Sequence, residues 1–147
     1  MNHEVAAKLA KYCAFQERCT LDVKVKLDNL NIPAEEQEEI ISYLKKNKFI
    51  DNRRFALTFA ESKFRNKKWG KVKIRFHLEQ KEITEKDICD ALDSIPEEEY
   101  LDLFHTLVAQ KSKTISAANE YNKNHKIAQY LISKGFEQDL IWQYLRV

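Results

Sequence analysis

The hydrophobic positions of this chain recur with one spacing in three separate segments. In the middle of the chain, five apolar residues follow one another at intervals of four, five, five and four: Ile74, Leu78, Ile83, Ile88 and Leu92. The same intervals separate Ile127, Leu131, Phe136, Ile141 and Leu145. They recur with one polar substitution in Val23, Leu27, Ile32, Gln37 and Ile41. Because self-similarity at a fixed spacing is the signature of a repeat architecture, we interpret the three segments as equivalent pairs of helices joined by a turn.

Two stretches compete with this helical interpretation, because their apolar and polar residues alternate as they do in a half-buried strand. They are Val72–Leu78 and Val23–Leu27. The equivalent C-terminal segment does not alternate, so equivalence of the three segments favours helices throughout. On a helix, Val72 and Phe76 would lie nearly opposite the core face. Two explanations of this second apolar face remain open: packing between neighbouring units, and contact of Phe76 with a partner.

Residues that cap or break helices mark where the expected helices begin and end. Three N-capping side chains each precede an apolar stretch: Thr20, Asp51 and Thr84. Proline suits the first turn of a helix, and glycine is common just after the last turn. Breaks of these kinds fall at Pro33, Gly70 and Gly135. The signals divide the chain into three units, with bounds 1–50, 51–95 and 96–147.

The last third of the chain carries a long helical pattern. It begins at Glu97 and extends to about Asn122, which is roughly 39 Å at 1.5 Å per residue. The polar segment 119–124 is the expected loop before the final pair of helices. Within the repeat, we expect four positions to belong to the hydrophobic core: Ile74, Leu78, Ile127 and Leu131.

The composition agrees with helices and narrows the class of protein. The 147 residues include two glycines and two prolines, too few for the turns of an all-β protein. A hydrophobic content of 44% argues against wholesale disorder, and 33% charged residues require much solvated surface. No uncharged run approaches the ~20 residues of a membrane span, and the N-terminus lacks a signal-peptide pattern. We expect a soluble, cytoplasmic monomer with no membrane contact.

Sequence motifs of catalysis and metal binding are not found. Cys13, Cys19 and Cys89 are an odd number without CxxC spacing, so we expect small buried hydrophobes and neither a disulfide framework nor a zinc site. The four histidines are scattered, the chain has no glycine-rich phosphate loop, and neither GxSxG nor HExxH occurs. We therefore expect no enzyme activity, no catalytic residue, no cofactor and no metal.

Charge is distributed unevenly along the middle of the chain. No acidic residue lies between Glu61 and Glu79, whereas residues 85–102 carry eight acids and one base. Aromatic residues such as Trp69 are interleaved with the bases. The candidate partner- or DNA-binding residues are Arg53, Arg54, Lys63, Arg65, Lys67, Lys68, Lys71, Lys73 and Arg75. Such asymmetry favours a partner-facing side, although a run of charge is about as often a solvated helix face.

The segment from Phe49 to Ile83 resembles the signature of the RecX family of bacterial recombinase regulators. The matching features are the Phe-Ile-Asp run that ends at Asp51, the Arg-Phe-Ala run that starts at Arg54, and the basic segment before Gly70. They continue through Ile74, Leu78, Lys81 and Ile83. The closing helix pair is also similar to that family's C-terminal unit, through Tyr130, Leu131, Lys134, Gly135 and Phe136.

The resemblance implies an all-α fold of three tandem three-helix repeat units in an elongated, curved array. Asn31 and Glu82 depart from the family pattern, because they stand where glycine is expected, so these turns must close without it. The resemblance also implies a partner and a function: binding of RecA recombinase and its single-stranded-DNA filament, with inhibition of filament growth, ATP hydrolysis and strand exchange.

Two other functions remain open on the residues themselves. The basic and aromatic segment would suffice for a free-standing nucleic-acid-binding protein that contacts DNA directly. Alternatively, the chain is a helical-repeat scaffold whose basic face only keeps it soluble.

Overall fold

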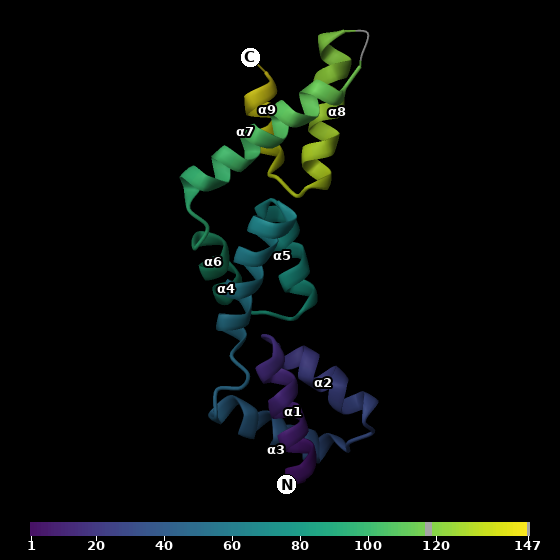
Figure 1. Cartoon of the computed structure of the whole chain (residues 1–147), viewed down its shortest axis with the longest axis vertical. Helices are drawn as coiled ribbons and strands as arrows, with labels where there is room; N and C mark the ends of the chain where they lie inside the picture. Colours follow the sequence, from purple (N-terminus) through teal and green to yellow (C-terminus); the bar gives the residue numbers. More distant parts are fainter. Residues whose placement is uncertain (117–118, 147) are drawn as a thin grey trace.

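The structure of the chain, a computed structural model, describes residues 1–116 and 119–146. Within these residues it holds nine α-helices, one π-helical turn and no strand (Figure 1). The elements are α1 (His3–Phe15), α2 (Thr20–Asn29), α3 (Ala34–Lys46), α4 (Asn52–Ser62), η1 (Lys63–Lys67), α5 (Lys71–Gln80), α6 (Glu85–Asp93), α7 (Glu97–Thr114), α8 (Glu120–Ser133) and α9 (Gln138–Leu145). Among these helices, none is long and apolar enough to cross a membrane.

The helices form three successive groups along the long axis of an elongated molecule, with the two termini at opposite ends (Figure 1). The first group is α1–α3, the second α4–α6 and the third α7–α9. The predicted all-α fold of tandem three-helix units is confirmed. The bounds 1–50, 51–95 and 96–147 stay our proposal for the units.

Capping side chains begin two helices where the sequence predicts them. Asp51 Oδ1 accepts a hydrogen bond from the Arg54 N–H at 2.9 Å, and Thr84 Oγ1 accepts one from the Asp87 N–H at 3.3 Å. Each of these bonds satisfies a backbone donor that has no partner inside its helix. Gly70 is the N-cap of α5, as its predicted place between two helices requires.

The predicted cap at Thr20 is wrong by one residue. The N-cap of α2 is Cys19, whose N–H donates to Asp22 Oδ2 at 3.1 Å. The Thr20 hydroxyl donates instead to Asn52 Oδ1 of α4 at 3.2 Å, and the Thr20 N–H donates to the same oxygen at 2.9 Å. A contact between the first and second helix groups therefore uses the side chain that the local pattern assigned to capping.

The predicted helix from Glu97 to about Asn122 is also wrong, because α7 ends at Thr114. The Thr114 hydroxyl donates to the Lys111 carbonyl at 2.9 Å, which satisfies an acceptor in the last turn. Ile115 then adopts extended backbone and packs against the core. The helix therefore ends where a half-buried apolar side chain turns to the core.

The expected loop at 119–124 is wrong for a related reason. Asn119 is the N-cap of α8 and accepts a hydrogen bond from the Asn122 N–H at 2.8 Å. Asparagine is among the best N-capping residues, so this polar segment begins a helix and does not link two. Residues 117–118 lie outside the described part of the chain.

Two hydrophobic cores hold the helices together. One lies within α1–α3, and the other is shared by α4–α9 and reaches Cys19 at the start of α2. The four predicted core residues are 0–3% exposed, which confirms them: Ile74, Leu78, Ile127 and Leu131. The polar member of the repeat, Gln37, is buried as well. Its Nε2 donates to Asp28 Oδ1 at 2.7 Å and to the Ile32 carbonyl at 2.8 Å, so its burial leaves no unpaired donor.

The stretch Val72–Leu78 belongs to helix α5, so the repeat outweighs the local strand-like alternation. Its second apolar face is open to solvent, with Val72 51% and Phe76 57% exposed. Packing between neighbouring units is therefore the wrong explanation of this face. Contact of Phe76 with a partner stays a prediction.

The turn between the last two helices of each group contains a residue with left-handed backbone. Asn31 and Glu82 both have φ of 58°, and Gly135 has φ of 93°. The three residues occupy equivalent positions, one before the third apolar residue of each repeat. The two turns that lack glycine therefore keep the left-handed backbone that glycine adopts in the third.

The middle helices of the three groups meet head to tail. The turn after α5 contacts the N-terminus of α2, where Lys81 Nζ lies 2.6 Å from Asp22 Oδ1; we call this contact the first joint. The turn after α8 contacts the N-terminus of α5, where the Gly70 N–H donates to the Lys134 carbonyl at 2.7 Å; we call this contact the second joint. The two helices of the second joint contribute to the same larger core, whereas those of the first joint belong to different cores apart from Cys19.

Candidate partner-binding surface

The basic segment lies where the chain reverses between α4 and α5. Helix α4 continues into the π-helical turn Lys63–Lys67, which ends at Lys68 with left-handed backbone and φ of 59°. Gly70 follows as the N-cap of α5. π-Helical turns are rare and are found frequently at functional sites. The reversal brings the bases that precede it near those that follow it.

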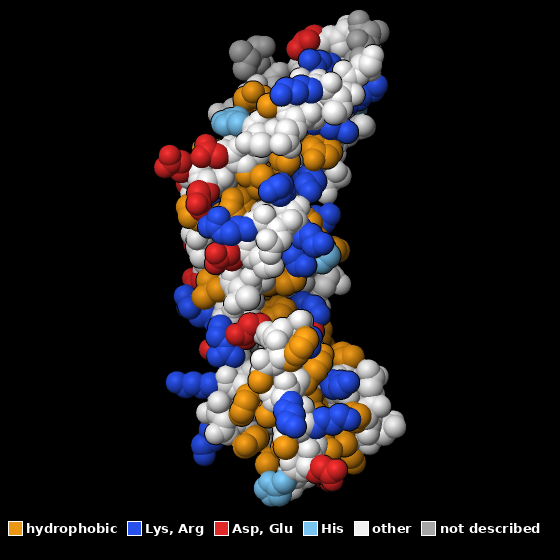
Figure 2. All heavy atoms as spheres, viewed as in Figure 1, with side chains coloured by type: hydrophobic (Ala, Val, Ile, Leu, Met, Phe, Trp, Pro, Cys, Tyr) orange, Lys and Arg blue, Asp and Glu red, His pale blue; other side chains and the backbone are white. Residues whose placement is uncertain are grey.

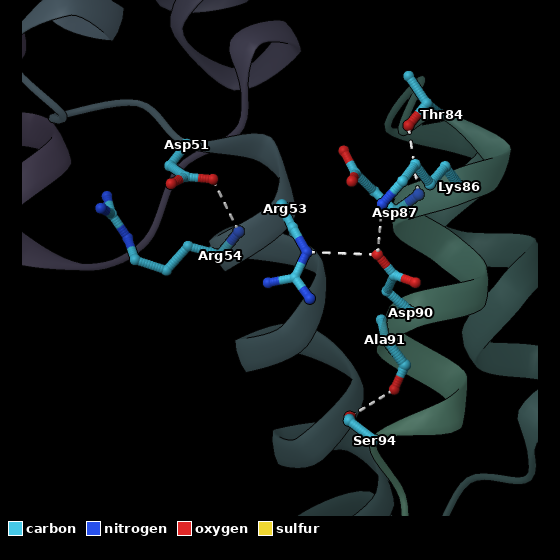
Figure 3. Close-up of polar contacts among 9 residues, drawn as sticks. All are labelled: Asp51, Arg53, Arg54, Thr84, Lys86, Asp87, Asp90, Ala91 and Ser94. Carbon is cyan, nitrogen blue, oxygen red and sulfur yellow. Dashed lines mark hydrogen bonds and ion pairs between the residues drawn. The ribbon is translucent and has the colours of Figure 1, made fainter.

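Two of the candidate arginines form ion pairs between helices. Arg53 Nε lies 3.3 Å from Asp90 Oδ2, which joins α4 to α6 (Figure 3). Arg54 Nε lies 2.7 Å from Glu17 Oε2, which joins α4 to the segment before α2. The hydrogen bond to Glu17 raises the pKa of the Arg54 guanidinium. Both side chains therefore serve contacts within the protein.

The other two candidate arginines are also paired. Arg65 lies 3.1 Å from both Glu61 Oε1 and Glu99 Oε2, and Arg75 Nη1 lies 2.7 Å from Glu85 Oε2. Hydrogen bonds to these carboxylates raise the pKa of each guanidinium. Because the guanidinium fork matches a carboxylate, these arginines have much of their charge compensated before any partner arrives.

The candidate lysines differ from the arginines. In the described part of the chain, no carboxylate lies within 4.0 Å of any of the five: Lys63, Lys67, Lys68, Lys71 and Lys73. Three of them lie over aromatic rings. Lys63 and Lys73 Nζ are 5.2 and 4.8 Å from the Trp69 ring centre, and Lys71 Nζ is 4.8 Å from that of Tyr100. Figure 2 shows Lys and Arg side chains gathered where the turn after α8 meets α5.

A sixth lysine, Lys134, joins this surface from the turn after α8, and it was not among the candidates. Its Nζ donates to the Lys67 carbonyl at 2.9 Å, across the second joint. Burial, and then the positive charges of Lys73 and Lys68, lower the pKa of the Lys134 ammonium. Such perturbed groups are enriched at functional sites. Alignment of the repeats could have found Lys134, because it stands at the position of Lys81.

Aromatic side chains lie directly beside the lysines. Trp69 stacks on His77 with ring centres 4.6 Å apart, and the exposed Phe76 meets His77 edge-on at 5.5 Å. Burial, and then the charges of Lys73 and Lys63, lower the pKa of His77. The surface therefore combines unpaired positive charge with partly exposed rings, which suits phosphates and bases or a partner's acidic and apolar side chains.

The cysteines and carboxylates form no further site in the described residues. Cys13 and Cys19 are buried as predicted, whereas Cys89 is half-buried, and all three are free thiols. The Cys89 thiol donates to Glu85 Oε1 at 3.3 Å, which accounts for its place at the surface. Among residues 1–116 and 119–146, no group of three or more His, Cys, Asp or Glu could hold a metal ion.

Family models match two of the three helix groups. The model of the RecX second three-helix domain matches residues 51–92, and the model of the RecX third three-helix domain matches residues 97–145. The chain belongs to the RecX family of regulatory proteins. The resemblance of the segment Phe49–Ile83 to the RecX signature is thereby confirmed.

Similar RecX proteins cover nearly the whole chain. Regulatory protein RecX of Limosilactobacillus reuteri is 28% identical over 134 residues, which are 91% of this chain and 51% of the relative. That of Chlorobium limicola is 27% identical over 95% of this chain and 86% of its own length. The chain spans about half the length of several RecX relatives that it matches.

Solved RecX structures have the same fold. The crystal structure of RecX from Lactobacillus salivarius is 26% identical, covers 97% of this chain and 96% of its own, and has a TM-score of 0.84. A second crystal structure of regulatory protein RecX covers 98% of this chain and 70% of its own, at 26% identity and a TM-score of 0.87. The lysine surface thus belongs to a regulatory RecX protein.

Proposed function

We propose that this RecX chain binds RecA and the RecA–DNA filament and inhibits recombinase activity. Inhibition extends to filament growth, ATP hydrolysis and strand exchange, and so modulates recombination and DNA repair in the cytoplasm. The chain acts by occupying a surface of the filament and is not an enzyme. The observation that carries the proposal is the separation of the bases into two classes: the arginines are paired within the protein, and the lysines around η1 are not.

Unpaired like charges repel one another, which makes them costly to gather without a partner. A filament of recombinase on DNA offers phosphates and acidic side chains that relieve this repulsion and release counterions. The exposed Phe76 and Val72 beside the lysines add apolar area that association would bury. The lysines and the apolar face together support binding to a nucleoprotein surface.

The test is a charge reversal of three lysines around the reversal, Lys67→Glu, Lys68→Glu and Lys71→Glu in one protein. Inhibition of the DNA-dependent ATPase of RecA is measured against protein concentration, with circular dichroism and melting temperature recorded alongside. We expect helicity and melting temperature to stay near those of the wild type and inhibition to be lost, because Lys67 and Lys68 are exposed, Lys71 is half-buried without a carboxylate partner in the described residues, and such charges contribute little to folding.

The matched control reverses three exposed lysines at the end of α3, Lys45, Lys46 and Lys48, which changes the net charge by the same amount. This control is expected to inhibit nearly as well as the wild type. If the η1 triple variant inhibits at wild-type concentrations, its lysines are only a solvated face and the proposal fails.

A binding comparison separates the proposed function from the two alternatives. Wild-type protein is added to bare single-stranded DNA, to RecA alone, and to RecA on DNA with ATP. A filament regulator prefers DNA coated with RecA, a free-standing DNA-binding protein binds bare DNA at least as well, and a scaffold ignores all three.

A further inference from the structure

The two joints between helix groups are built alike, but they differ in charge at one pair of positions. By the spacing of the repeat, Lys73 of α5 corresponds to Asp22 of α2, and Lys134 after α8 corresponds to Lys81 after α5. In the first joint, the pair is Lys81 and Asp22, at 2.6 Å. In the second joint, both members are lysines.

The pair in the first joint is a favourable contact. Burial alone would raise the pKa of Asp22, but the hydrogen bonds from Lys81 and from the Cys19 N–H outweigh it and lower that pKa. The hydrogen bond between Lys81 and Asp22 also raises the pKa of the Lys81 ammonium. The charges of this joint therefore complement each other without any outside group.

In the described part of the chain, the equivalent pair in the second joint has no carboxylate within 4.0 Å. Lys73 Nζ donates to the Ser133 carbonyl at 3.4 Å, and Lys134 Nζ donates to the Lys67 carbonyl at 2.9 Å. Each lysine thus crosses the joint to a neutral oxygen. Lys68 directly follows Lys67, whose carbonyl accepts the hydrogen bond of Lys134, so it brings a third positive charge to the same place. The backbone contact of the joint is formed without the anion, because the Gly70 and Val72 N–H groups donate to the Lys134 and Gly135 carbonyls.

We propose that Lys68, Lys73 and Lys134 form a site for a phosphodiester group of single-stranded nucleic acid, which clamps the second joint by supplying the anion that Asp22 supplies in the first. The proposal deepens the proposed function, on which its biological setting rests, by naming what this part of the surface contacts in a nucleoprotein.

The aromatic neighbours of the site favour a nucleic-acid phosphate over the carboxylates of a protein. Lysine binds either anion as a compact point charge, and every candidate arginine is already paired with a carboxylate, so the charge left unpaired here is that of lysines. Aromatic rings lie beside the site, with Lys73 Nζ 4.8 Å from the Trp69 ring centre and Phe76 57% exposed on the same helix. Bases of a single strand stack on such rings.

The test measures how binding of a fluorescent oligothymidylate depends on salt. Each phosphate contact on a single strand contributes about 0.7 to the slope of log affinity against log salt concentration. Lys134→Gln is expected to lower the slope by about 0.7, and Lys73→Asp by up to about 1.4, because the new carboxylate also occupies Lys134. The control Lys45→Asp on α3 should leave the slope unchanged.

Lys73→Asp should weaken DNA binding but increase the stability of the free protein. Lys73→Asp recreates the charge pair of the first joint, so its melting temperature without DNA should rise by ~1–4 °C, the range for a partly exposed ion pair in a chain of this size. The oligothymidylate should raise the melting temperature of the wild type and not that of Lys73→Asp. Lys134→Gln provides an independent measurement if the aspartate disturbs the fold.

Three results would overturn the site. One is failure of the wild type to bind the oligothymidylate, and another is a wild-type salt slope in both variants. The third is loss of binding to DNA-free RecA with unchanged DNA binding, which would assign the lysines to an acidic protein surface. If the salt slopes of the two variants decrease as expected while the wild type does not inhibit RecA, the site stands and the proposed function fails.

Discussion

The second joint should tolerate no side chain at Gly135. Its φ of 93° is unfavourable for every residue except glycine, and a Cβ there would lie 2.2 Å from Lys73 Cβ and 2.7 Å from Lys73 N. Neither atom is the free end of a flexible side chain, so the turn after α8 must move away from α5. Gly135→Ala should therefore open the joint.

The cost can be worked from the contacts that the movement breaks. Left-handed backbone costs an alanine roughly 1–2 kcal/mol. Separation of the turn from α5 loses two backbone hydrogen bonds, Gly70 N–H to the Lys134 carbonyl and Val72 N–H to the Gly135 carbonyl, each with a net value of about 0.5–1.5 kcal/mol. With some loss of packing at the neighbouring Phe136, we expect about 3–5 kcal/mol, or a melting temperature about 6–20 °C lower.

The assay is thermal unfolding followed by circular dichroism at the helical minimum. The matched control is Glu82→Ala at the equivalent turn of the first joint. Glu82 has φ of 58°, already carries a Cβ and is exposed, so this substitution should change stability by about 0.5 kcal/mol at most. A Gly135→Ala protein that melts as the wild type does would refute the close approach and the joint built on it.

Two further outcomes check the core and the lysine surface. Leu78→Ala and Leu131→Ala remove fully buried side chains and should each cost about 2–5 kcal/mol, seen as a lower melting temperature; no change would mean that the stripe faces solvent. In an NMR titration, His77 should have a pKa below its ordinary value, and Lys63→Gln with Lys73→Gln should raise it, because burial and these two charges lower it. Since the folded state then binds fewer protons than the unfolded state, stability should fall as the pH drops below the unfolded pKa of about 6.5 toward the folded one. A His77 pKa that is unchanged in the double variant would contradict this account.

The helical units and their core residues could be predicted because their signals are local or repeat within the chain. The spacing of Ile74, Leu78 and their counterparts reports one buried face, and the caps Asp51 and Thr84 act within three residues of themselves. Local alternation at Val72–Leu78 pointed to a strand, and comparison of the repeats corrected it. The left-handed turns at Asn31 and Glu82 likewise follow from their alignment with Gly135.

The candidate surface was predictable only as a set of bases near one chain reversal. In the sequence, Arg65 and Lys68 are both simply positive residues of one basic segment. In the structure, Arg65 forms an ion pair with Glu99, which is 34 residues away. Arg54 is held by Glu17 from the first helix group, 37 residues away. The pairs of Arg65 with Glu61 and of Arg75 with Glu79 span four residues and could have been read from the helical spacing. The long-range pairs of Arg53 and Arg54 leave no local pattern, so the sequence could not separate these two arginines from unpaired bases.

The sequence by itself therefore determined the all-α repeat, its buried positions and the region where positive charge is concentrated, because hydrophobic periodicity and composition act over a few residues. Tertiary structure alone decided that α7 stops at Thr114, where the half-buried Ile115 packs against the core with extended backbone. It also decided that Lys134 joins the lysines of the middle unit, and that the second joint lacks the anion present in the first. Each of these outcomes depends on which distant residue arrives as a neighbour, and that is fixed only when the units dock.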